Sequence, residues 1–208
     1  MEPRAPAYWP AACAELAAAD AVMAALIARY PDCVLGHRGD PFQTLVRAIV
    51  GQQISVKAAD SIWARFEAQV ECVTPERVAA LASNDLEACG LSRRKVEYLQ
   101  DLAGHFADGR IRPARWKRMV DASVIDELTD VRGIGRWTAE MFLIFGLRRP
   151  DVWPLDDIGL QKAVALHYLG GVRPTPEALR RHGERHAPWR TVATWYLWRS
   201  LDPVVVQY

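Results

Sequence analysis

The run from Leu128 to Ala139 constrains the fold of this chain more than any other segment. It reads Leu-Thr-Asp-Val-Arg-Gly-Ile-Gly-Arg-Trp-Thr-Ala, so Gly133 and Gly135 bracket Ile134. Two glycines around one apolar residue predict a tight turn with left-handed backbone angles, because glycine has no Cβ to oppose them. Residues 136–145, which follow, have the apolar spacing of a helix. The segment therefore predicts two helices joined by a glycine hairpin.

The same hairpin is suited to bind an anion. It leads directly into a helix N-terminus, where backbone N–H groups lack intrahelical partners and the helix dipole is positive. A phosphate group is a ligand that such a terminus favours. A bare G-x-G turn is also common in the core of helical proteins. The longer pattern L-x-x-V-x-G-I-G-x-x-T-A favours the phosphate site.

Nearly the whole chain has helical periodicity, and we expect a compact all-α fold with short connections. Thr175-Pro176 marks a helix start and Gly170-Gly171 marks a helix end. Only the 203–208 tail has a strand-like pattern. The predicted helices span about residues 10–29, 40–51, 55–69, 75–82, 92–107, 113–118, 123–130, 136–145, 157–169, 175–183 and 188–200.

The composition allows a sizeable core but gives no general sign of a nucleic-acid partner. Half of the 208 residues are hydrophobic, and the net charge is only +1. Any evidence for nucleic-acid binding must therefore come from local features. The four cysteines lack the spacing of zinc or iron–sulfur sites, so we expect reduced, buried thiols in a cytoplasmic protein without a membrane segment. The arginines in and after the hairpin are Arg132, Arg136, Arg148, Arg149 and Arg190.

The hairpin and the segment after it resemble a known family. A glycine- and proline-containing loop, residues 146–154, precedes the sequence Leu155-Asp-Asp-Ile-Gly-Leu160. This order is similar to that of the helix-hairpin-helix (HhH-GPD) DNA glycosylase superfamily, in its 3-methyladenine DNA glycosylase II type. Residues 45–56 and 188–198 resemble the family's wedge-bearing helix and its C-terminal helix. The resemblance covers about residues 10–200.

The resemblance implies one helical glycosylase unit over residues 1–208, built from two subdomains around a cleft that holds the active site. The division is expected near residue 122. One part, residues 35–122, would resemble a six-helix barrel and carry the wedge turn. The other, residues 1–34 plus 123–208, would carry the hairpin, the catalytic aspartate and the C-terminal pocket helix. The family's N-terminal mixed α/β domain is expected to be lacking, because residues 1–40 are too few for it.

A carboxylate directly after the loop is the candidate catalytic group. Alkylation at a purine ring nitrogen makes the base a good leaving group, so the sugar is the part that needs stabilisation. One ionised carboxylate can stabilise an oxocarbenium-like sugar and orient the attacking water. Asp156 and Asp157 both qualify chemically. In the family motif the aspartate lies twenty positions after the hairpin tryptophan, here Trp137, which selects Asp157 and leaves Asp156 as the expected helix N-cap.

The base must leave the helical stack to reach this carboxylate. Aromatic side chains suit an electron-poor, cationic base. The resemblance implies that Gln53 is the wedge that fills the gap left by the base, and that Gln52 lies at the edge of the pocket. Gln53 could alternatively be an exposed turn residue without this role, and Trp198 could alternatively belong to the core. The residues implied to line the pocket are Trp137, Met141, Trp198, Gln52 and Ile158, and those implied at the DNA backbone are Gln53, Arg132, Gly133, Gly135, Arg136 and Thr138.

Trp137 also bears on the type of reaction. Bifunctional relatives have a lysine at this position that forms a Schiff base, and tryptophan cannot do so. The expected function is a monomeric, monofunctional glycosylase that removes 3-methyladenine, 7-methylguanine and related bases from double-stranded DNA at the bacterial nucleoid. No cofactor is required, although K⁺ or Na⁺ is implied at the backbone carbonyls of Thr129, Val131 and Ile134. The alternatives are a non-catalytic DNA-binding module and a glycosylase with lyase activity on oxidised or mismatched bases.

Overall fold

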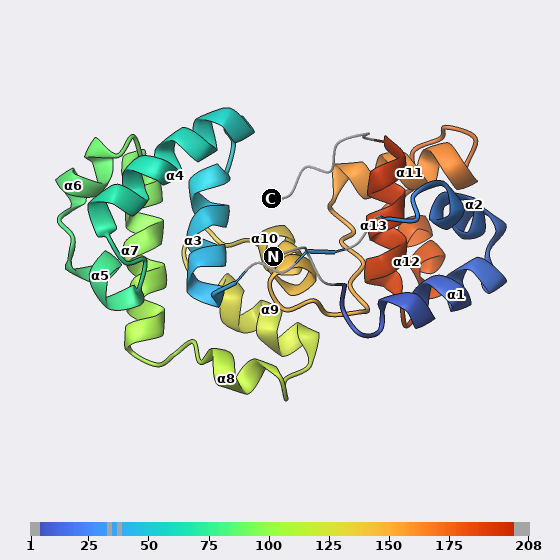
Figure 1. The fold of residues 1–208 in the computed structure, drawn as a ribbon, viewed down its shortest axis with the longest axis horizontal. Helices are drawn as coiled ribbons and strands as arrows, with labels where there is room; N and C mark the ends of the chain where they lie inside the picture. Colours follow the sequence, from blue (N-terminus) through green and yellow to red (C-terminus); the bar gives the residue numbers. More distant parts are fainter. Residues whose placement is uncertain (1–4, 33–34, 37–38, 202–208) are drawn as a thin grey trace. The chain divides into compact units, whose positions relative to one another are not determined.

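A computed structural model describes residues 5–32, 35–36 and 39–201. Within these ranges the regular secondary structure consists of thirteen α-helices and no strand (Figure 1), so the predicted all-α class is confirmed. The strand-like tail at 203–208 lies outside the described residues. Among the helices in the described part of the chain, none is long and apolar enough to cross a membrane.

The chain packs into two compact units. Unit 1 comprises Met1–His37 and Leu143–Gln207, and unit 2 is formed by Arg38–Phe142. The division after Phe142 groups the hairpin with the middle of the chain, whereas the family resemblance predicts a boundary near residue 122. The reason is local packing: the Tyr98 ring lies against Gly133, and Phe142 makes an edge-on ring contact with Trp116 at 5.2 Å.

Unit 2 is organised around one long helix, α7 (Arg93–Ala107), which packs against α3, α5 and α6. Its buried residues Val96, Leu99 and Leu102 form a stripe on one face, as expected for a helix that joins a core. Ser92 caps this helix by accepting a hydrogen bond from the amide of Lys95. The other helices are α3 (Pro41–Gly51), α4 (Val56–Val70), α5 (Pro75–Ala80), α6 (Ser83–Ala88), α8 (Pro113–Trp116), α9 (Asp121–Thr129) and the part of α10 (Arg136–Phe145) up to Phe142.

Unit 1 joins the two ends of the described chain. Its centre is α13 (Arg190–Leu201), which is buried from Thr191 to Leu197 and packs against helices from both segments of the unit. Figure 1 shows these helices, coloured blue and orange to red, gathered together. The surrounding helices are α1 (Trp9–Ala19), α2 (Ala21–Arg29), α11 (Ile158–Tyr168) and α12 (Pro176–Glu184).

Three predictions about local structure are wrong. The helix predicted over 10–29 is two helices, because Asp20 is extended (φ −142°) and its side chain accepts the amides of Val22 and Met23 as the N-cap of α2. Helix α6 was not predicted, because Ala82 before it is not a capping residue and no proline marks its start. The thiols are not all buried either: Cys89 is buried, but Cys72 is exposed.

Candidate active site and DNA-binding turns

The glycine hairpin of unit 2 has the turn that its sequence predicts, with one correction. Gly133 has a φ of 86°, and a Cβ at this position would collide with the ring of Tyr98. Gly135 lies outside the left-handed region, and a Cβ there would meet no atom within 4 Å. Gly133 is thus required by conformation and packing. Gly135 leaves open space in front of the first turn of α10, where a phosphate can approach.

Side chains outside the hairpin hold it in place. The carboxylate of Asp101 accepts a hydrogen bond from the amide of Arg132 at 2.8 Å, and Gln52 Nε2 donates to the Gly133 carbonyl at 3.0 Å. Gln52 was expected at the edge of a base pocket, which stays a prediction, and its amide nitrogen contacts the hairpin. Arg132 pairs with Glu97 at 3.5 Å and Arg136 with Glu140 at 3.0 Å, while Thr138 is buried.

The carbonyls predicted to hold a monovalent cation belong to the same hairpin. The Val131 carbonyl accepts the amide of Ile134 at 3.1 Å, so one of its two lone pairs is used within the turn. Thr129 is the last residue of α9, and its hydroxyl donates back to the Ile125 carbonyl at 2.9 Å. The three carbonyls thus stand at the end of a helix and in a turn, which are positions where backbone oxygens lack helical partners. The cation site stays a prediction.

The turn after α3 presents the predicted wedge. Gln53 is exposed and has a φ of 58°, which is unusual for a residue with a side chain. Two apolar side chains nearby are also in contact with solvent: Ile54 on the turn is 37% exposed, and Val56, the first residue of α4, is 58% exposed. The alternative interpretation of Gln53 as an exposed turn residue describes its location. Its role as a wedge stays a prediction.

The candidate catalytic carboxylate lies in unit 1. Asp157 is the N-cap of α11, is only 8% exposed, and accepts the Leu160 amide on Oδ1 at 2.6 Å. Asp156 was expected to be this cap, but it lies exposed in the preceding turn. Two adjacent aspartates satisfy the same capping preference, and the backbone of the loop decides which of them caps. Asp157 thus combines burial with a position at the positive end of a helix dipole.

Trp198 completes this arrangement. Its Nε1 donates a hydrogen bond to Oδ1 of Asp157 at 2.7 Å, and its ring stacks on Phe145 with centroids 5.9 Å apart. Gly159 makes room for the pair, because a Cβ there would lie 3.1 Å from both the carboxylate and the indole ring. Trp198 was predicted as a pocket residue, but its hydrogen bond to Asp157 was not predicted. Phe145 and Gly159 were missed as well.

The remaining predicted pocket residues belong to different units. Trp137 is half-buried and Met141 is buried, both on α10 within unit 2. Ile158 directly follows Asp157 in unit 1, is 62% exposed, and lines a shallow hollow of about 390 Å³ along α11. Within the described residues, no group of three or more histidine, cysteine, aspartate or glutamate side chains is arranged to hold a metal ion.

The arginines after the hairpin have structural partners. Arg190 forms a two-point ion pair with Asp151, at 2.6 and 2.7 Å. The carbonyl of Arg148 accepts the Tyr8 hydroxyl, and that of Arg149 accepts the Thr191 hydroxyl. These contacts tie the loop between α10 and α11 to α1 and α13. The loop that precedes Asp157 is therefore fixed by side chains from both segments of unit 1.

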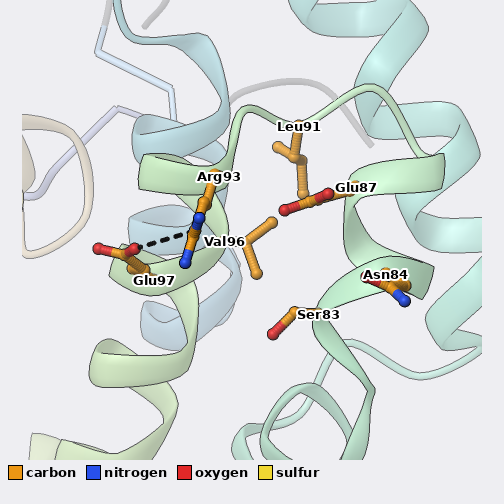
Figure 2. Close-up of a pocket in the computed structure, with 7 residues that line it drawn as sticks. All are labelled: Ser83, Asn84, Glu87, Leu91, Arg93, Val96 and Glu97. Carbon is orange, nitrogen blue, oxygen red and sulfur yellow. Dashed lines mark ion pairs between the residues drawn. The ribbon is translucent and has the colours of Figure 1, made fainter.

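A second hollow, of about 590 Å³, lies beside the start of α7 and contains none of the predicted site residues (Figure 2). It adjoins the turn at Gly90, whose positive φ of 96° resembles that of Gly133. Glu87 and Glu97 line it, and Arg93 is paired with Glu97 at 3.8 Å. Two carboxylates beside one paired arginine do not favour a phosphate. The similarity of the two glycine turns is therefore one of backbone geometry.

Comparison with known proteins agrees with this geometry. The family model of the HhH-GPD superfamily base excision DNA repair protein matches residues 46–188. DNA-3-methyladenine glycosylase 1 of Schizosaccharomyces pombe is 38% identical over 170 residues, which are 79% of this chain and 74% of that protein. A crystal structure of a DNA-3-methyladenine glycosidase from Bacillus halodurans is 35% identical with a TM-score of 0.77, covering 87% of this chain and 89% of that one. The S. pombe 3-methyladenine DNA glycosylase in complex with abasic DNA gives a TM-score of 0.79 at 31% identity, covering 95% and 98%.

Proposed function

This chain belongs to the HhH-GPD superfamily of base excision DNA repair proteins, and we propose that it is a monofunctional DNA glycosylase that removes alkylated bases from duplex DNA. Its substrates would be 3-methyladenine, which the names of its relatives mention, together with 7-methylguanine and related bases. The observation that carries the proposal is the buried carboxylate of Asp157 at the start of α11, with the Trp198 indole bonded to it. Such a fixed carboxylate suits the stabilisation of a positively charged sugar.

Binding to DNA would begin at the backbone. The amides at the start of α10 and the open space at Gly135 suit a phosphate, and this contact is the same for every base sequence. The alkylated nucleotide then leaves the stack, and Gln53 enters the gap. Its exposed turn, with Ile54 and Val56 beside it, suits entry between bases, because apolar side chains are the usual wedges.

Asp157 would then act on the sugar. The bond between C1′ and the base nitrogen breaks, and the base takes the electron pair and leaves as a neutral molecule. Positive charge develops on the sugar, where the carboxylate of Asp157 stabilises it. A water molecule bonds to C1′ and gives its proton to the same carboxylate. The products are the free base and an intact abasic site.

The flipped base itself would be held by aromatic and sulfur-containing side chains, for which Trp137, Met141 and Trp198 stay the predicted residues. A cationic base gains from the face of an aromatic ring beyond plain stacking. Trp198 has one face against Phe145, so only its other face would be offered to a base. Trp137, where bifunctional relatives have lysine, has no amine to attack C1′. The reaction would therefore end without strand cleavage.

The hairpin cation is a finer part of the proposal. The carbonyls of Thr129, Val131 and Ile134 would hold K⁺ or Na⁺, which would add positive charge where the phosphate binds. Exchange of K⁺ for a larger quaternary ammonium ion at constant ionic strength would test this. We expect weaker DNA binding in the quaternary ammonium salt, and equal binding in both salts would contradict the cation site.

One assay tests the main proposal. The protein is incubated with a methylated duplex and with an oxidised duplex, and both free base and strand breaks are measured. Release of methylated base without strand cleavage is expected. Cleavage of the oxidised duplex would indicate a lyase, and binding without release of base would indicate a DNA-binding module. Either of these two outcomes would overturn the proposal.

A further inference from the structure

Three side chains of α7 contact the two turns of unit 2 that would face DNA. Lys95 Nζ donates to the carbonyls of Val50 and Gln52, at 2.8 and 2.9 Å, at the end of α3. Tyr98 packs against Gly133 of the hairpin, and Asp101 accepts the amide of Arg132. The three positions are spaced by three residues, so they follow one side of the helix. A single helix thus contacts the wedge turn and the hairpin together.

The wedge turn needs such support. Gln53 has a positive φ of 58°, a backbone conformation that is unfavourable for a residue with a side chain. The last carbonyls of α3 also lack intrahelical partners. The ammonium group of Lys95 satisfies two of these carbonyls and places a positive charge at the negative end of the α3 dipole. Lys95 therefore stabilises the conformation in which the Gln53 side chain is presented.

The two turns are also joined directly. Gln52 Nε2 donates to the carbonyl of Gly133, while the carbonyl of Gln52 accepts from Lys95. Gln52 thus lies between α7 and the hairpin, next to the wedge residue. Loss of the Lys95 contact would remove the two hydrogen bonds that hold the carbonyls of Val50 and Gln52 at the start of the wedge turn. The hairpin would keep its contacts with Tyr98 and Asp101.

We propose that Lys95 is a positioning residue for the wedge. Through Lys95, Tyr98 and Asp101, α7 would fix the position of the Gln53 turn relative to the hairpin that binds the DNA backbone. The inference rests on the proposed function, in which Gln53 fills the gap in the duplex. The inference predicts that two properties of DNA binding can be changed independently. Affinity for intact duplex depends on the hairpin, whereas preference for a duplex with a gap depends on the Lys95 contact.

The test compares the wild type with Lys95→Met, which keeps the aliphatic stem and removes the ammonium group. Affinity is measured for an intact duplex and for the same duplex with a tetrahydrofuran abasic site. Base release is measured in a single turnover on a 7-methylguanine duplex. We expect Lys95→Met to lower both the preference for the abasic duplex and the rate of base release about tenfold, the scale of a lost charge-assisted hydrogen bond. Affinity for intact duplex should stay unchanged.

Matched variants separate this role from general stability. Lys95→Arg restores a cation that can reach the same carbonyls and should recover most of the preference. Lys117→Met removes an exposed lysine on the loop after α8 and should have no effect. If Lys95→Met does not fold, as judged by circular dichroism, Lys95→Gln carries the same comparison, because its amide can donate to only part of the site.

A double-mutant cycle decides whether Lys95 acts through the wedge. In a Gln53→Ala background, Lys95→Met should cause little further loss of preference or rate. Full additivity would overturn the inference, as would wild-type preference in folded Lys95→Met. These results differ from a failure of the proposed function, in which the wild type itself would release no base. A wild type without base release, but with a preference that depends on Lys95, would leave the role of α7 intact.

Discussion

The indole nitrogen of Trp198 donates to the same carboxylate oxygen of Asp157 that caps α11, at 2.7 Å. One oxygen of Asp157 therefore accepts two N–H groups, one from the backbone of Leu160 and one from a residue 41 positions later. Two donors from different elements fix the orientation of the carboxylate. Trp198 therefore does more than offer a ring for stacking: it connects α13 to the candidate catalytic carboxylate of Asp157.

Asp157→Asn should abolish base release while DNA binding is kept. Asparagine is as good an N-cap as aspartate and can still accept from Trp198, so the fold should be retained. Loss of the negative charge at the sugar should lower the single-turnover rate by on the order of 10²-fold or more. Asp156→Asn is the matched control, because Asp156 is exposed in the adjacent turn. If Asp156→Asn is the inactive variant, the catalytic assignment is off by one residue.

Trp198→Phe should slow base release about tenfold with little effect on DNA affinity. Phenylalanine keeps a ring that can stack on Phe145 but lacks the donor to Asp157, so the carboxylate loses its contact with α13. The rate is measured in a single turnover on a 7-methylguanine duplex. Trp189→Phe is a suitable control, since it removes an indole donor that contacts Glu15 elsewhere in unit 1. An unchanged rate in Trp198→Phe would mean that the hydrogen bond does not position Asp157.

The features that the sequence predicted correctly are local ones. The hairpin and eleven predicted helical segments depend on spacing and caps within a few residues, and the described structure has helices at all of those segments. Asp20 shows the limit of this reasoning. It interrupts an alanine-rich run that otherwise reads as one helix, and its capping role became evident only from its extended backbone.

The contacts that organise the candidate site depend on packing between distant segments. Lys95 reaches carbonyls more than forty positions earlier, and Trp198 reaches Asp157 across a similar separation. No periodicity within one helix encodes such pairs. Trp198 was found by resemblance to a family, but the identity of its partner required the fold. Lys95 follows two arginines in the first turn of α7, and this basic segment did not indicate that the Lys95 ammonium group contacts the end of α3.

Trp137→Ala should impair the release of charged bases more than that of neutral ones. An aromatic face attracts a cation by about 0.5–2 kcal/mol beyond stacking, so the extra loss on a cationic base should be about twofold to thirtyfold. Rates are compared on 3-methyladenine and hypoxanthine duplexes, after circular dichroism has confirmed the fold. Equal losses on both would show that Trp137 only shapes the pocket.

Gly133→Ala and Gly135→Val should have different effects. Alanine at 133 must adopt a positive φ and displace the Tyr98 ring, which should lower the free energy of unfolding by on the order of 2 kcal/mol. Valine at 135 meets open space in the free protein and should leave stability close to that of the wild type, but it would obstruct a phosphate. We expect affinity to fall roughly tenfold on several unrelated duplexes alike. Urea unfolding and fluorescence titration measure the two effects, and unchanged affinity in Gly135→Val would exclude this approach of the phosphate.

Acidification should destabilise unit 1 through buried His186 and its neighbour His182. His186 is 1% exposed, and burial, with His182 next, lowers its pKa from 6.5 to about 4. The Nε2 atoms of the two rings are 3.4 Å apart, and burial lowers the pKa of His182 as well. The Trp153 ring packs against both histidines, and titratable groups face the pair as well. Arg185 adds to the lowering of the pKa of His186 and Asp20 opposes it, while Tyr168 packs against both rings and donates to Asp20 at 3.1 Å.

The sign of this pH dependence follows from whether the folded or the unfolded state binds more protons. The unfolded chain protonates His186 near pH 6.5, whereas the folded chain resists until about pH 4. Between these values the unfolded state holds more protons than the folded state. The contribution of His186 to the free energy of unfolding should therefore be constant above pH 6.5 and fall as the pH drops from 6.5 toward 4. The slope from one group is at most about 1.4 kcal/mol per pH unit. Urea unfolding at pH 7, 6 and 5 measures it, and His186→Gln, which cannot titrate, should flatten the profile. Parallel profiles for the wild type and His186→Gln would show that this pair does not set the acid sensitivity.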